Sequence, residues 1–139
     1  MASEYPISKP VEVVADISSP ALPDDRLSRE SMLQVFDQDA ALLRELAELF
    51  LADSPILLND IQTGVAALDA AKVERAAHTL KGSVGNFGAK RAFELSRRIE
   101  AMARNHDLGG APETLAALNQ EMARVSALMA AEVAREKHS

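Results

Sequence analysis

From Leu27 onward, apolar residues recur at intervals of three and four along several consecutive stretches of the chain. That spacing puts them on one face of an α-helix, and each such helix must bury this face against a neighbour. No stretch alternates apolar and polar residues as a half-buried strand does, and only 4 % of the residues are aromatic. The sequence therefore predicts an all-α protein: an up-and-down four-helix bundle with a short additional N-terminal helix.

Each of the four long helical stretches has its own apolar stripe. The predicted stripes are Leu42, Leu46, Leu49, Phe50, Leu57, Leu58, Ile61, Val65 and Leu68 in residues 39–68; Val73, Ala76, Ala77, Leu80 and Val84 in residues 70–85; Ala92, Leu95, Ile99 and Met102 in residues 89–105; and Leu115, Leu118, Met122, Val125 and Met129 after Pro112. Glycine-containing breaks around Gly88 and Gly110 separate the last three stretches.

Short polar residues stand where the helices are expected to begin. Ser28 can cap a short first helix over Arg29–Phe36, and Asp39 and Asp69 can cap the two helices that follow. These side chains accept hydrogen bonds from backbone N–H groups that have no partner within the first turn.

Pro55 interrupts the longest helical stretch. Either the helix continues through it with a kink, or Ser54 caps a second segment that has Pro55 as its first residue. The pattern alone leaves both alternatives open.

Proline concentrates ahead of the bundle, at Pro6, Pro10, Pro20 and Pro23. Because proline stops helices, residues 1–26 are predicted to be a flexible Pro-rich tail or interdomain linker. A cloning remnant joined to a native linker would have the same composition. Residues 27–135 are assigned to the bundle and 136–139 to a frayed C-terminus, and the polar residues from Glu132 onward are expected to fray.

Composition excludes several classes of function. The formal net charge of −6 disfavours nucleic acid as a partner, and the lack of cysteine excludes disulfides and thiolate metal sites. The three histidines, His78, His106 and His138, show no metal-ligand spacing, so no metal is expected. No apolar run reaches the roughly 20 residues that span a bilayer, and no secretion signal begins the sequence. We therefore expect a cytoplasmic protein without membrane contact.

The stretch from Arg75 to Ala89 has the composition of a reactive site. On a helix, His78 lies away from the core stripe, and Lys81 and Gly82 lie one turn further along the same face. Gly82 and Gly85 each cost about 1 kcal/mol relative to Ala inside a helix, and they would leave open space beside the imidazole. An imidazole nucleophile, a nearby cation and room for a second protein together suit phosphoryl transfer.

Each of these features has a simpler explanation when taken alone. Most surface histidines have no role, glycines let helices pack closely, and a lysine is usually a solvated charge. Their combination on one helical face is what favours a site. The predicted docking surface around His78 comprises Ala71, Glu74, Arg75, Gly82, Ser83, Gly85 and Asn86.

The run His78-Thr79-Leu80-Lys81-Gly82-Ser83, followed by Gly88-Ala89, resembles the signature of histidine phosphotransfer (HPt) domains. The similarity continues through Phe93, Ser96, Ile99 and Glu100, is weaker over residues 43–51, and covers roughly residues 28–130. Val84 stands where the family often has a small residue, and Phe87 where it often has Leu. These departures would alter the choice of docking partner more than the chemistry.

The resemblance implies roles for four residues. His78 would be the phosphoacceptor, Lys81 would assist transfer by compensating charge, and Gly82 would clear the docking surface. Glu100 would hold Nδ1 of the imidazole and leave Nε2 free to attack. The simpler alternative for Glu100 is a surface acid paired with Arg97 or Arg104.

The resemblance also implies a function in a phosphorelay. The chain would accept a phosphoryl group from a receiver aspartyl phosphate and pass it to another receiver, which would supply the Mg²⁺. It would be a phosphocarrier that has neither an ATP site nor a cofactor of its own. It would also be a monomer. It would be free-standing or, as the Pro-rich segment favours, part of a hybrid sensor kinase.

Two other functions compete with this one. The bundle could be an interaction module that is never phosphorylated. A histidine-kinase dimerisation helix is disfavoured, because Thr79 and not an acidic residue follows the histidine and no proline appears before Pro112.

Overall fold

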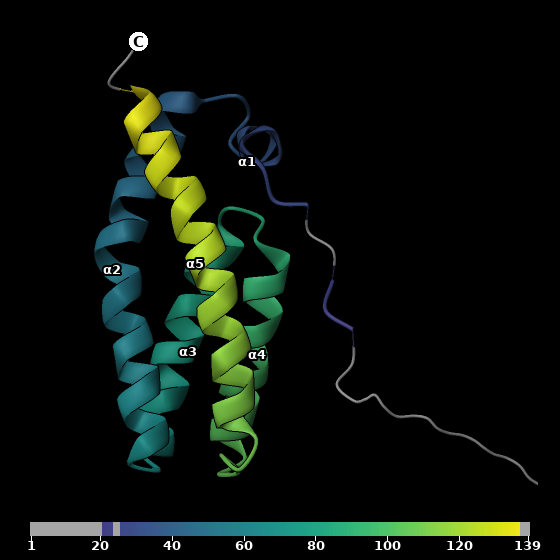
Figure 1. Cartoon of the computed structure of the whole chain (residues 1–139), viewed down its shortest axis with the longest axis vertical. Coiled ribbons are helices and arrows are strands. Elements are labelled where there is room, and N and C mark those ends of the chain that lie inside the picture. The colour runs from purple at the N-terminus through teal and green to yellow at the C-terminus, as the bar shows by residue number, and fades with distance from the viewer. Residues whose placement is uncertain (1–20, 24–25, 137–139) are drawn as a thin grey trace, which may run out of the picture.

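The structure is a computed structural model that describes residues 21–23 and 26–136 (Figure 1). These residues form five helices: α1 (Arg29–Val35), α2 (Ala40–Ala66), α3 (Ala70–Gly85), α4 (Lys90–Arg104) and α5 (Ala111–Glu136). The described part of the chain contains no strand. The all-α fold, a four-helix bundle with a short leading helix, is therefore confirmed.

The predicted helix caps are present. The hydroxyl of Ser28 accepts a hydrogen bond from the backbone of Ser31, whose own hydroxyl accepts one from Ser28 N–H. The carboxylates of Asp39 and Asp69 each accept from the backbone N–H three residues further on. Polar residues at these positions thus set where three of the helices begin.

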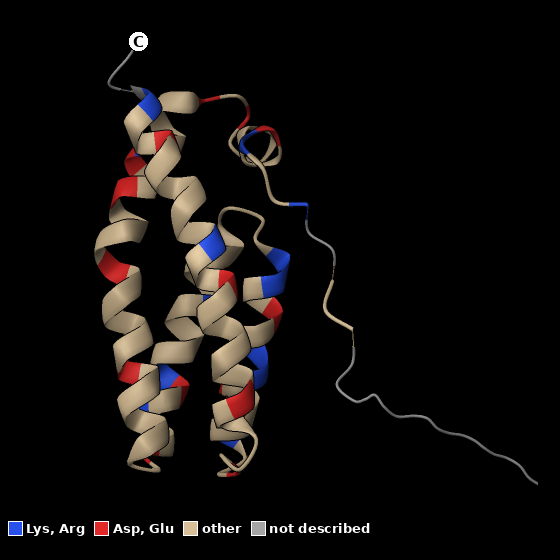
Figure 2. Cartoon of the chain, in the orientation of Figure 1, with Lys and Arg blue, Asp and Glu red and all other residues tan. Residues whose placement is uncertain are grey.

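The four long helices form a closed antiparallel ring. α3 packs against α2 and α4, and α5 packs against the same two helices from the other side. Figure 1 shows α2 and α5 extending past the shorter α3–α4 hairpin, with α1 beside their projecting ends. The largest fully buried side chains are Met32, Leu43, Ile61, Leu80, Ile99, Leu118, Met122 and Met129. Acidic and basic residues are interspersed over the outside of the bundle (Figure 2).

α2 continues unbroken through Pro55. Ser54 is buried within the helix, so it does not cap a second segment. The alternative of a second segment capped by Ser54 is therefore wrong, and α2 is a single helix that contains the proline.

The apolar stripe predicted for the first half of α2 is wrong at two of its four positions, whereas Phe50 is buried and Leu46 is partly buried against the core. Leu42 and Leu49 are 41 % and 57 % exposed, whereas Leu43 and Ala47 are fully buried. Leucines in this region fall on two overlapping helical faces, and only the packing of α2 on its neighbours selects one of them. Leu68, predicted to continue the stripe, lies in the turn after the helix and is exposed.

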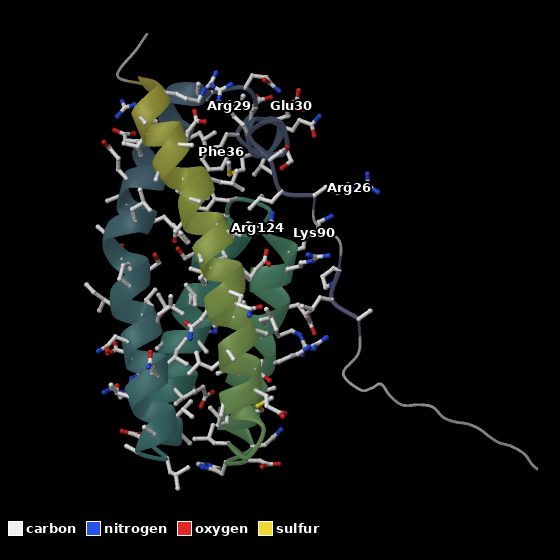
Figure 3. All side chains as sticks on the ribbon, in the orientation of Figure 1. Arg26, Arg29, Glu30, Phe36, Lys90 and Arg124 are labelled. Atoms are coloured by element: carbon white, nitrogen blue, oxygen red, sulfur yellow. The ribbon has the colours of Figure 1, made fainter. Side chains whose placement is uncertain are left out.

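The short helix α1 is attached to the bundle at both ends (Figure 3). Phe36 stacks on Phe87 with ring centroids 5.6 Å apart, and Phe87 in turn makes a T-shaped contact with Phe50 on α2. Arg29 Nε donates to Glu132 on α5 over 2.8 Å. Glu132 is buried inside α5, which continues to Glu136, so the expectation that the chain frays from Glu132 is wrong over the described residues.

Part of the predicted linker lies against the bundle. Leu22 packs on the hydrophobic core, and the carbonyl of Pro23 accepts a hydrogen bond from Arg91 Nε over 2.8 Å. The rest of the predicted tail, residues 1–20 and 24–25, and residues 137–139 lie outside the described residues. Among the helices that are described, none combines the length and hydropathy that a bilayer crossing requires.

Candidate functional site

The packing of α3 determines where His78 points. Val73, Ala77, Leu80 and Val84 are fully buried against the neighbouring helices. His78 lies on the opposite side of the helix, so its side chain is 67 % exposed. The exposure predicted from the helical pattern is therefore present, and the imidazole is open to a second protein.

Glu100 reaches the imidazole from the antiparallel helix α4. Its Oε2 lies 2.7 Å from Nδ1 of His78, although the Glu100 side chain is only 3 % exposed. An ionised carboxylate can only accept hydrogen bonds, so Nδ1 carries the proton and donates it. In the neutral imidazole, Nε2 then has the free lone pair.

Two cations also contact the Glu100 carboxylate. Lys81 Nζ lies 2.8 Å from Oε1, and Arg104 Nη2 lies 2.8 Å from Oε2. Arg104 also donates through Nε to Glu74 on α3 over 3.1 Å. Buried Glu100 is thus the centre of a network that links His78, Lys81 and Arg104.

The charge state of Glu100 follows from its surroundings. Burial opposes ionisation, but hydrogen bonds and charge from Lys81 and His78 outweigh it and hold the pKa of Glu100 below its ordinary value. The carboxylate is therefore ionised at neutral pH, as its role as an acceptor requires.

The contacts of Glu100 include one from each sequence interpretation, but the residue is buried and is not the surface acid of the second interpretation. It holds Nδ1 of His78, and it also pairs with Arg104, one turn along α4. Arg97, the other suggested partner, pairs instead with Glu94. Arg104 was not predicted as a site residue, although its i,i+4 spacing from Glu100 was a usable signal.

The two glycines beside His78 differ in their surroundings. A Cβ placed on Gly82 would have no neighbour within 4 Å, so this position leaves open space as predicted. A Cβ on Gly85 would lie 3.2 Å from Cδ1 of Phe93 on α4. The expectation of open space beside Gly85 is therefore wrong for a side chain at this position, because it would meet the Phe93 ring, although Gly85 itself is exposed.

Two shallow hollows flank the exposed histidine face. One, of about 420 Å³, lies between α3 and α4 and is lined by Glu74, Arg75, His78, Thr79, Glu100 and Arg104. The other, of about 160 Å³, lies between α2 and α3 and is lined by Leu46, Leu49, Phe50, Asp53, Ser83, Asn86 and Phe87. The α2 residues of the second hollow were not among the predicted docking residues, which all came from α3 and its C-terminal end.

The predicted docking residues all belong to α3 or to its C-cap. Ala71, Arg75, Gly82, Gly85 and Asn86 are exposed, and Glu74 and Ser83 are partly exposed. The described residues bring together no group of three histidine or acidic side chains that could hold a metal ion.

Comparison with known proteins shows which family the chain belongs to. A family model for the Hpt domain matches residues 45–128 of the chain. The chain belongs to the Hpt domain family. Hpt domains carry phosphoryl groups on histidine in two-component phosphorelays and interact with receiver domains. Histidine phosphotransfer in a two-component phosphorelay is therefore the function of this four-helix bundle.

A solved structure supports the assignment of this Hpt domain. The chain is similar to histidine-containing phosphotransfer protein B (HptB) from Pseudomonas aeruginosa PAO1, with a TM-score of 0.69 and 26 % sequence identity. The match covers 85 % of this chain and 98 % of that chain. The comparison with curated proteins found no match.

Proposed function

We propose that His78 is the residue of this Hpt domain that accepts the phosphoryl group from a receiver aspartyl phosphate and passes it to a second receiver. The observation that carries the proposal is the contact between exposed His78 and buried Glu100. It presents Nε2 to the outside with its lone pair available.

The transfer needs no proton to move on this chain. Nε2 of His78 attacks the phosphorus in line, the bond from phosphorus to the aspartyl oxygen breaks, and the aspartate leaves as a carboxylate. The phosphorylated imidazole keeps its proton on Nδ1 and becomes positively charged. Ionised Glu100, 2.7 Å from Nδ1, stabilises that charge. The reverse sequence delivers the group to the next receiver.

Lys81 is proposed to compensate charge on the phosphoryl oxygens. Its ammonium lies 2.8 Å from Glu100, on the same face as His78 and one turn away. Its side chain is 24 % exposed, so it can turn from Glu100 toward a phosphoryl group at Nε2. This domain acts as a carrier, and we expect the receiver to bring Mg²⁺ and most of the catalytic groups.

The receiver is proposed to dock on the exposed face of α3. The predicted docking residues surround His78, and Gly82 provides the closest approach. Ser83 and Asn86 extend this face to the hollow with Leu49 on α2. An interface of modest size fits a relay whose partners must separate after each transfer.

The test compares wild type with His78→Gln, using a receiver that its cognate kinase has phosphorylated. We expect acid-labile, alkali-stable label on wild type and none on the variant, with helical content unchanged. His106→Gln is the matched control, because His106 is exposed in the turn after α4 and away from Glu100. Label on His78→Gln would assign the phosphate to another residue. No label on wild type, from receivers that phosphorylate other Hpt domains, would favour an unphosphorylated interaction module.

A further inference from the structure

Phe93 is an exposed aromatic side chain at the edge of the site. It lies on α4 and is 38 % exposed, and it belongs to the same face of the helix as Glu100 and Arg104. Water contact with so large an apolar ring is unfavourable, so its position calls for a physical reason. The ring reaches α3 beside Gly85, where an added Cβ would lie 3.2 Å from Cδ1 of Phe93.

Gly85 and Phe93 fit together as a pair. The distance of 3.2 Å from a Cβ at Gly85 to the Phe93 ring is tighter than ordinary van der Waals contact. Only glycine lets the ring lie this close to the α3 backbone without a shift. The close approach of the Phe93 ring thus explains why glycine stands at this position despite its cost within a helix.

The same ring also contacts Lys81, which is one turn before Gly85 on α3. Lys81 Nζ lies 5.9 Å from the centroid of the Phe93 ring, within the range of a cation–π interaction. On the other side, Nζ lies 2.8 Å from Oε1 of Glu100. The ammonium is therefore held between an aromatic ring and a buried carboxylate.

This arrangement restricts where the Lys81 side chain can go. Side chains on a helix lean toward its N-terminus, which for Lys81 is the direction of His78. The Phe93 ring, beside Gly85, lies on the C-terminal side of Lys81. A flexible lysine stem would otherwise sample that space and carry its charge away from the imidazole.

We propose that Phe93 is a positioning residue for phosphoryl transfer, which acts through Lys81 by confining its ammonium beside His78. This inference rests on the proposed function of His78 and Lys81. Phe93 makes no contact with the imidazole in this role. Gly85 contributes by giving the ring its place.

Two measurements test the proposal. In the first, NMR of the whole chain follows the Lys81 Hε protons, which a nearby aromatic ring shifts upfield. We expect that shift in wild type and in Phe93→Tyr, which keeps the ring, and its loss in Phe93→Leu, which keeps an apolar side chain. The same Lys81 resonance in wild type and Phe93→Leu would overturn the proposal.

The second measurement is a double-mutant cycle on the rate of transfer from a phosphorylated receiver. At saturating receiver, Phe93→Leu should slow transfer about two- to fivefold with little change in KM, the range expected from an exposed cation–π contact. Phe93→Tyr, which keeps the ring, should transfer at the wild-type rate. In a Lys81→Met background, which keeps the stem and removes the charge, Phe93→Leu should have no further effect.

The outcomes separate this inference from the proposed function. An equal slowing in the Lys81→Met background, or a rise in KM alone, would show that Phe93 contacts the receiver directly and would overturn the positioning role. Failure of wild type to take up label would contradict the proposed function instead. The NMR comparison would still decide whether Phe93 holds Lys81.

Discussion

His78 Nδ1 and Glu100 Oε2 lie 2.7 Å apart, although the two residues are 22 positions apart in the chain and differ sharply in exposure. The imidazole is largely in solvent and the carboxylate is almost completely buried. Because the buried partner cannot move freely, it fixes the orientation of the exposed one. The geometry and protonation of the reactive ring are thus set from within the bundle.

Removing the Glu100 carboxylate should change the tautomer of His78. In Glu100→Ala, we expect the proton to occupy Nε2 in a larger fraction of neutral imidazoles, which ¹⁵N NMR of the ring nitrogens measures directly. Loss of a charge-assisted hydrogen bond of ~1.5 kcal/mol should slow transfer about tenfold. Glu94→Gln, also on α4 but away from His78, is the control. Identical nitrogen shifts in wild type and Glu100→Ala would show that the contact does not set the tautomer.

Lys81→Ala should slow transfer while the domain stays folded. Glu100 keeps Arg104 as a charged partner, so the buried carboxylate is not left alone. Loss of ~1.4 kcal/mol of charge compensation would lower the rate about tenfold. Single-turnover kinetics and thermal unfolding measure the two quantities, with Lys72→Ala in the first turn of α3 as control. A wild-type rate in Lys81→Ala would remove this residue from the mechanism.

Gly82 should tolerate a side chain in the free domain but not in the complex. Because a Cβ there meets nothing within 4 Å, Gly82→Ala and Gly82→Gln should fold, and Ala should raise the free energy of unfolding by about 0.5–1 kcal/mol. Gly82→Gln should nevertheless weaken receiver binding and raise KM at least tenfold by filling the space beside His78. Titration calorimetry checks the affinity. Transfer kinetics in Gly82→Gln that match wild type would refute the steric role.

Acid should destabilise the domain through two carboxylates on α4. Hydrogen bonds from Arg97 lower the pKa of Glu94 from its ordinary 4.5 to about 2; burial opposes this shift, and Arg98 adds to it. The pKa of Glu100 is also lowered. Below pH 4.5 the unfolded chain binds protons that the folded chain does not, so the free energy of unfolding falls as pH decreases toward 2.

Urea unfolding at several pH values checks this dependence. Glu94→Gln should flatten the loss of stability between pH 4.5 and 2, because the variant has no proton to bind at this site. Glu100→Gln should also reduce the loss of stability in acid, by an amount set by how far folding lowers the pKa of Glu100. A Glu94→Gln profile parallel to wild type would show that Glu94 does not contribute.

Local sequence was enough to predict much of this protein. Helices with strong periodicity and side-chain caps, such as α3 between Asp69 and Gly85, depend on contacts within a few residues and were placed correctly. The exposed position of His78 followed from the same periodicity. The short signature around His78 also pointed to the family that the comparisons confirm.

Tertiary structure decided what depends on contacts between helices. Two overlapping leucine faces on α2 were equivalent in sequence, and packing chose Leu43 over Leu42. Gly82 and Gly85 looked alike until α4 brought Phe93 over one of them. Likewise, the convergence of Lys81 and Arg104 on buried Glu100 needs two helices in register. Periodicity determines the buried face of a helix that has a single apolar stripe, as α3 does. Only the packed bundle selects between overlapping faces and determines what each side chain meets there.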